Sequence, residues 1–136
     1  MTTLHDADRG RLPGLLVVDP DPRQRDALAR GMHQLGWRVW ASADCATALD
    51  AYREYRERID AALVDLQLPG LQGARLLAEL DRLGPGLTRC AMSADVTPYT
   101  ASAFRRLSAT PLFAKPVDAA ALSFTLHELM TAAVRS

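Results

Sequence analysis

The regular alternation of short apolar runs with longer segments of helical periodicity is the feature that most constrains the fold. Residues 15–18 (LLVV) and 61–64 (AALV) are uniformly apolar and too short to form helices of their own. Segments such as 22–35, where Leu28, Met32 and Leu35 recur at helical spacing on one face, separate these runs. Apolar strands that alternate with helices are typical of a parallel sheet covered on both faces. We therefore predict an α/β fold with a doubly wound, five-stranded parallel sheet.

The same two patterns place the remaining elements along the chain. Strands are predicted at residues 15–18, 37–41, 61–64, 87–92 and 112–114. Helices are predicted at 22–35, after a cap at Asp44, at 71–83, at 98–107, and in a last segment with Leu122, Leu126, Leu129 and Ala133 inward. We expect residues 1–13 to form a disordered leader and residues 14–134 to form one domain.

Composition excludes several classes of function. Sixteen basic and sixteen acidic residues leave no net charge and no basic stripe, so we expect no direct nucleic-acid partner. Cys45 and Cys90 have no metal-binding or disulfide-framework spacing. The polar start of the chain and the absence of a membrane-length apolar run predict a cytoplasmic protein without a membrane partner.

Four polar side chains at the ends of predicted strands form a candidate site. The carboxyl ends of parallel strands meet at one edge of an open α/β sheet, where reactive sites form. One of these residues is a lysine in a chain whose other fifteen basic residues are arginines, which indicates a site that a guanidinium does not serve. The four residues are Asp19, Asp65, Ser93 and Lys115.

This set suits phosphoryl transfer onto a carboxylate, a reaction in which the protein mainly positions groups and neutralises charge. Asp65 would be the nucleophile, and Asp19 would help to hold Mg²⁺. Lys115 and the Ser93 hydroxyl would bind the remaining phosphoryl oxygens.

The motifs around these residues resemble those of the receiver domains of two-component response regulators. They are Val17-Val18-Asp19, Asp65-Leu66-Gln67-Leu68-Pro69-Gly70, Met92-Ser93-Ala94 and Lys115-Pro116, in that order. The resemblance implies strand order 2-1-3-4-5 and phosphorylation of Asp65 by a histidine kinase or phosphotransfer protein. It also implies a metal site formed by Asp19, Asp65 and the backbone carbonyl of Gln67.

The resemblance further implies a signalling phosphoacceptor, not an enzyme, with at most self-phosphorylation from small donors and self-dephosphorylation. Ser93 would sense the conformational response, and the side chains of Gln67 and Asp95 would influence the lifetime of the phosphoryl group. A downstream protein would bind the face made by the fourth helix, fifth strand and fifth helix, where Arg105 and Arg106 lie beside Phe104. A homodimer is a further expectation.

Two positions depart from the usual pattern of this family. Pro20 replaces the second acid of the pair after the first strand, which predicts weaker Mg²⁺ binding. Asp21 is either a substitute ligand or an acid at the start of the first helix, and the second interpretation is favoured. Leu112 replaces the common switch aromatic residue, whereas Phe113 should face the opposite side of its strand.

Two alternatives therefore stand beside the phosphorylatable receiver. Pro20 and Leu112 favour a degenerate receiver that acts as a phosphorylation-independent interaction module. Asp19-Pro20-Asp21 also resembles the signature of haloacid-dehalogenase-like phosphohydrolases, although Arg23 stands where their threonine or valine is expected. That alternative also leaves the motif from Asp65 to Gly70 unexplained.

Overall fold

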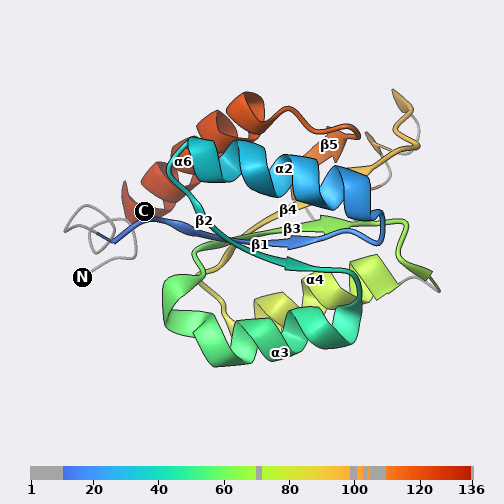
Figure 1. Ribbon diagram of the computed structural model, residues 1–136. Helices are drawn as coiled ribbons and strands as arrows, with labels where there is room; N and C mark the ends of the chain where they lie inside the picture. Colours follow the sequence, from blue (N-terminus) through green and yellow to red (C-terminus); the bar gives the residue numbers. More distant parts are fainter. Residues whose placement is uncertain (1–10, 70–71, 99–100, 103, 105–109, 136) are drawn as a thin grey trace.

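The computed structural model describes residues 11–69, 72–98, 101–102, 104 and 110–135, with the side chains up to residue 133. Figure 1 shows a central sheet between two layers of helices. In chain order the elements are β1 (Gly14–Val18), α2 (Pro22–Gln34), β2 (Arg38–Ser42), α3 (Cys45–Tyr55), the short 3-10 helix η1 (Arg56–Arg58), β3 (Ala61–Asp65), α4 (Gln72–Leu83), β4 (Thr88–Ser93), β5 (Leu112–Ala114) and α6 (Ala119–Arg135).

The sheet is parallel throughout, with strand order β2-β1-β3-β4-β5. This confirms the predicted fold class and the order implied by the resemblance. The side chains of β1 and β3 are buried on both faces, as expected for central strands between two helical layers. In Figure 1, α2 and α6 lie on one face, and α3 and α4 lie on the other.

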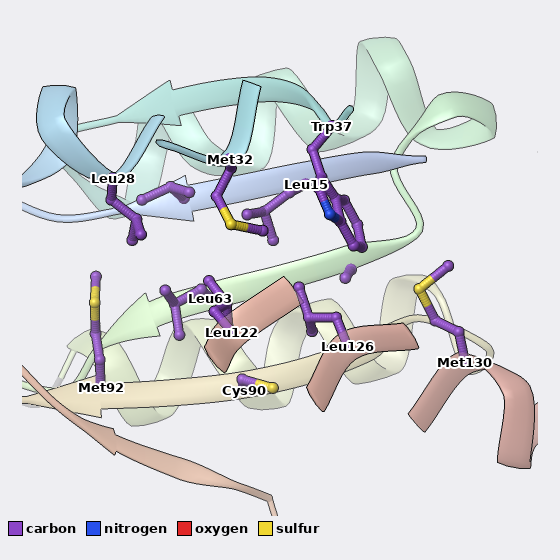
Figure 2. Close-up of a cluster of buried hydrophobic side chains, with 12 residues drawn as sticks. Leu15, Leu28, Met32, Trp37, Leu63, Cys90, Met92, Leu122, Leu126 and Met130 are labelled. Atoms are coloured by element: carbon purple, nitrogen blue, oxygen red, sulfur yellow. The ribbon is translucent and has the colours of Figure 1, made fainter. Parts of the chain in front are cut away.

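Each face of the sheet has its own hydrophobic cluster. Figure 2 shows the cluster beneath α2 and α6, where Leu15 and Leu63 of the sheet meet Met32 and Leu122 of the helices. Leu16 and Val64 point to the other cluster, where they meet residues of α3 and α4. Adjacent residues of one strand thus serve opposite clusters because side chains alternate along a strand.

Local sequence signals account for several helix ends. The Asp44 carboxylate accepts a hydrogen bond from Thr47 N (2.8 Å), which caps α3 as predicted. Gly36 has φ = 92°, a left-handed conformation that glycine adopts without steric cost, and α2 ends just before it.

Three details of the predicted helices were wrong or lie outside the described residues. Leu35, expected on the inner face of the first helix, is the C-cap residue of α2 and is 48% exposed because the chain turns away there. Ala133 is exposed, and Met130 occupies the inward position instead. Within the fourth predicted helix, residues 98, 101–102 and 104 are helical, while 99–100, 103 and 105–107 lie outside the described residues.

Candidate functional site

The carboxyl edge of the sheet brings together the four polar residues singled out in the sequence. Asp65 and Ser93 are the last residues of β3 and β4, and Asp19 and Lys115 directly follow β1 and β5. Backbone hydrogen bonds extend the sheet to the last two: Asp19 N donates to Ser42 O (3.0 Å), and Lys115 N donates to Ser93 O (2.9 Å). Parallel pairing thus brings distant parts of the chain to one edge.

The ammonium of Lys115 lies between the two carboxylates. Its Nζ donates to Asp19 Oδ1 (3.0 Å) and to Asp65 Oδ2 (2.7 Å). The side chains are only 8%, 2% and 2% exposed, so water screens these pairs weakly. Burial alone lowers the pKa of Lys115. The hydrogen bonds that its ammonium donates to Asp65 and Asp19, together with the negative charges of these carboxylates, outweigh burial and raise the pKa.

The loop after β3 fixes the orientation of the Asp65 carboxylate. Its Oδ1 accepts a hydrogen bond from Gln67 N (2.8 Å), while Oδ2 accepts from Lys115. Leu66 N donates to Met92 O (2.9 Å), which continues the pairing with β4. Gly73 of α4 lies so close to the Asp65 carbonyl that a Cβ atom would overlap it. The helix can approach the site only because residue 73 has no side chain.

A second set of contacts joins this loop to the end of β4. The Gln67 Oε1 atom accepts a hydrogen bond from Ala94 N (2.9 Å). The Ser93 Oγ atom accepts from Asp95 N (3.1 Å), a bond that does not use the hydroxyl's own hydrogen. The sequence led us to expect a metal-binding carbonyl at Gln67 and an influence of its side chain on the lifetime of the phosphoryl group, but it did not predict this contact. No local pattern signals the contact because the two residues are 27 positions apart.

The donors at this edge fit Mg²⁺ only in part. Mg²⁺ is usually held by one or two carboxylates, and Asp19 and Asp65 supply two. Both carboxylates, however, already form ion pairs with Lys115. Pro20 supplies no ligand, and the Asp21 carboxylate accepts a hydrogen bond from Arg23 N (3.0 Å) as the cap of α2. Within the described parts of the chain, no group of three or more histidine, cysteine or acidic residues could hold a metal.

The two residues at the expected switch position lie on opposite faces of β5. Leu112 packs against the cluster beneath α3 and α4, and Phe113 packs against the one beneath α2 and α6. The prediction that Phe113 faces away from its neighbour is therefore confirmed. The adjacent face that Arg105 and Arg106 were expected to form lies outside the described residues.

The fold of this chain recurs in known proteins. A CheY-like response regulator receiver domain protein from Methanospirillum hungatei JF-1 superposes with a TM-score of 0.75 at 25% identity, covering 91% of this chain and 98% of that one. The CheX-CheY-BeF3-Mg complex from Borrelia burgdorferi gives a TM-score of 0.77 at 20% identity, covering 90% and 92%, which shows the common fold.

Residues 15–127 match the profile of the response regulator receiver domain. The chain therefore belongs to the receiver domain family of two-component response regulators. Such domains are generally signalling phosphoacceptors that bind Mg²⁺ and interact with histidine kinases or phosphotransfer proteins and with downstream effectors.

A sensory/regulatory protein named RpfC, from Xanthomonas campestris pv. campestris, is 35% identical over 125 residues. The match includes 89% of this chain and 17% of that protein, so the chain spans about a sixth of its length. The transcriptional activator protein PfeR from Pseudomonas aeruginosa is 41% identical over 70 residues, which are 52% of this chain and 22% of PfeR. No described helix of this chain is long and apolar enough to cross a membrane.

Proposed function

We propose that this receiver accepts a phosphoryl group on Asp65 from a histidine kinase or phosphotransfer protein and relays the signal through a conformational change. One observation carries the proposal. The Lys115 ammonium binds Asp65 Oδ2 at 2.7 Å and Asp19 Oδ1 at 3.0 Å in a nearly solvent-free cluster. A charge held there neutralises oxyanions at the position where a phosphoryl group would arrive.

Each residue of the site has a distinct role in this proposal. A carboxylate oxygen of Asp65 attacks the phosphorus atom, forming a new P–O bond as the bond to the donor breaks and the donor leaves with the electron pair. Lys115 transfers its hydrogen bond from the carboxylate to a phosphoryl oxygen. The Ser93 hydroxyl donates its hydrogen to another such oxygen while still accepting from Asp95 N.

Asp19, Asp65 and the backbone carbonyl of Gln67 are the proposed magnesium ligands. The ion would supply positive charge that offsets the phosphoryl oxygens. Pro20 leaves this set one carboxylate short, and Asp21 is engaged in capping α2. We therefore expect weaker Mg²⁺ binding than a second acid at position 20 would give.

A degenerate receiver that binds partners without phosphorylation is the second candidate function. The capping role of Asp21 favours it, because the acid nearest to Pro20 already caps the helix. The same contact argues against the phosphohydrolase alternative, in which this acid would face the reaction centre.

The remaining features of the proposal concern partners and boundaries. The proposed output surface is the face of the fourth helix, β5 and α6, and a homodimer through it is included in the proposal. The cytoplasm is the proposed location.

Small phosphodonors would support self-phosphorylation, with later self-dephosphorylation. Residues 1–13 are proposed as the leader and 14–134 as the receiver.

Intact-mass spectrometry after incubation with acetyl phosphate and Mg²⁺ tests the main proposal. We expect an increase of one phosphoryl group in the wild type and none in Asp65→Asn. Pro20→Asp should raise the yield at low Mg²⁺ and tighten metal binding. An adduct that persists in Asp65→Asn would refute the assignment of Asp65. An adduct that appears only in Pro20→Asp would favour the interaction module.

A further inference from the structure

Three arginines line a hollow at the amino end of the sheet, opposite the candidate phosphorylation site. Arg11 precedes β1, Arg38 begins β2, and Arg58 ends η1. Together with Leu12 they surround a volume of about 480 Å³. That volume is within the range of small-molecule sites and far exceeds the roughly 30 Å³ that one water molecule occupies.

The backbone holds the three segments together. Arg38 N donates to Pro13 O (2.9 Å), and Arg11 Nη1 donates to Arg58 O (3.1 Å). Gly14 packs against the Arg58 carbonyl so closely that a Cβ atom would overlap it. The guanidinium groups therefore project from a frame that is already ordered, which reduces the entropy lost when a ligand binds.

The charges in this hollow are only partly balanced. The Asp60 carboxylate, 1% exposed, accepts from Arg11 Nη2 (2.9 Å) and from Gly14 N (2.8 Å), and so neutralises Arg11. Arg38 and Arg58 are exposed, and within the described residues no acidic side chain lies within ion-pair distance of either. Among the side chains that the structure describes, two positive charges thus remain unbalanced at one small hollow in a chain of zero net charge.

We propose that this hollow is a binding site for a small ligand that carries a di- or oligophosphate group. Guanidinium forks bind phosphate oxygens through paired hydrogen bonds, and two unbalanced forks require an anion with several oxygens and more than one charge. A single carboxylate would satisfy only one of them. A long nucleic acid would need phosphate contacts along a basic stripe, whereas this charge is confined to one hollow.

Isothermal titration calorimetry with pyrophosphate, at constant ionic strength, tests the proposal on the full chain. We expect saturable binding at one site, with inorganic phosphate binding more weakly. Arg38→Ala and Arg58→Ala should each weaken pyrophosphate binding about tenfold or more, because each removes charge-assisted hydrogen bonds. Arg38→Lys should recover only part of the loss, since it keeps the charge without the fork.

Two control variants separate this site from other sources of binding. Arg75→Ala removes an exposed arginine near the start of α4, at the opposite end of the sheet, and should leave pyrophosphate binding unchanged. Asp65→Asn should also leave it unchanged. Thermal melting confirms that each variant is folded.

Several outcomes would overturn the proposal. One is the absence of pyrophosphate binding at millimolar concentration, and another is equal weakening by Arg75→Ala and Arg38→Ala, which indicates diffuse surface charge. A change in Asp65→Asn alone would assign the anion to the phosphoacceptor pocket. Binding of a single-stranded oligonucleotide without binding of pyrophosphate would assign the arginines to a polymer backbone instead.

Discussion

Replacing Lys115 by methionine should destabilise the folded protein strongly. Methionine keeps an unbranched side chain but removes the ammonium that binds both Asp19 and Asp65. All three side chains are at least nine-tenths buried, so the two carboxylates would remain in a poorly hydrated site without a counter-charge. Removal of one partner from a buried ion pair costs about 3–5 kcal/mol, and we expect a loss of that size at pH 7. Total stabilities of domains are about 5–15 kcal/mol, so the variant should still fold.

Urea unfolding monitored by circular dichroism measures this loss as a shift of the midpoint at unchanged slope. The double variant Asp65→Asn, Lys115→Met leaves only one carboxylate without its partner. It should therefore be more stable than the sum of the two single losses predicts, with a coupling of roughly 0.5–3 kcal/mol. A loss below about 1 kcal/mol in Lys115→Met, or strict additivity in the double variant, would refute the view that these three charges form one unit.

Three further predictions use other features of the molecule. Folding raises the pKa of Lys115, so the contribution of this residue to stability should be complete below the ordinary lysine pKa of 10.5 and should be lost as pH rises through the raised pKa. In urea unfolding, the free energy of unfolding of the wild type should therefore decrease at alkaline pH, and Lys115→Met should lack this decrease. Gly73→Ala should lower both stability and the yield of the acetyl phosphate adduct, since the added methyl group displaces the Asp65 carbonyl; an unchanged yield would contradict the tight packing there. Burial raises the pKa of Cys90 to about 12, so iodoacetamide at pH 8.5 should modify the half-buried Cys45 first and Cys90 only after unfolding, as peptide mapping would show.

The sequence predicted the sheet and the convergence of the four polar strand-end residues because both depend on strong local patterns. Uniformly apolar runs identified the buried strands, and the residues that follow them, Asp19 and Lys115 among them, had to meet at one edge. The exposure of Leu35 could not be predicted in this way, because periodicity does not show at which residue a helix ends.

Contacts between distant side chains were also beyond sequence reasoning. The pairing of Arg11 with Asp60 joins residues 49 positions apart, and Trp37 Nε1 donates to Ser123 Oγ across 86 positions. Neither pair has a spacing that a helix or strand imposes. These contacts depend on the relative placement of whole elements, which a single sequence does not encode as a readable pattern.

The division of the hydrophobic residues into two clusters has a consequence for local opening. Among the described residues the two clusters lie on opposite faces of the sheet, so loss of α6 packing removes contacts from one face and leaves those of α3 and α4 in place. Amide protons of α6 and α2 should then exchange with solvent deuterium through an opening that does not expose α3. Loosening of one side of this sheet would thus leave the packing on the other side to keep the domain folded.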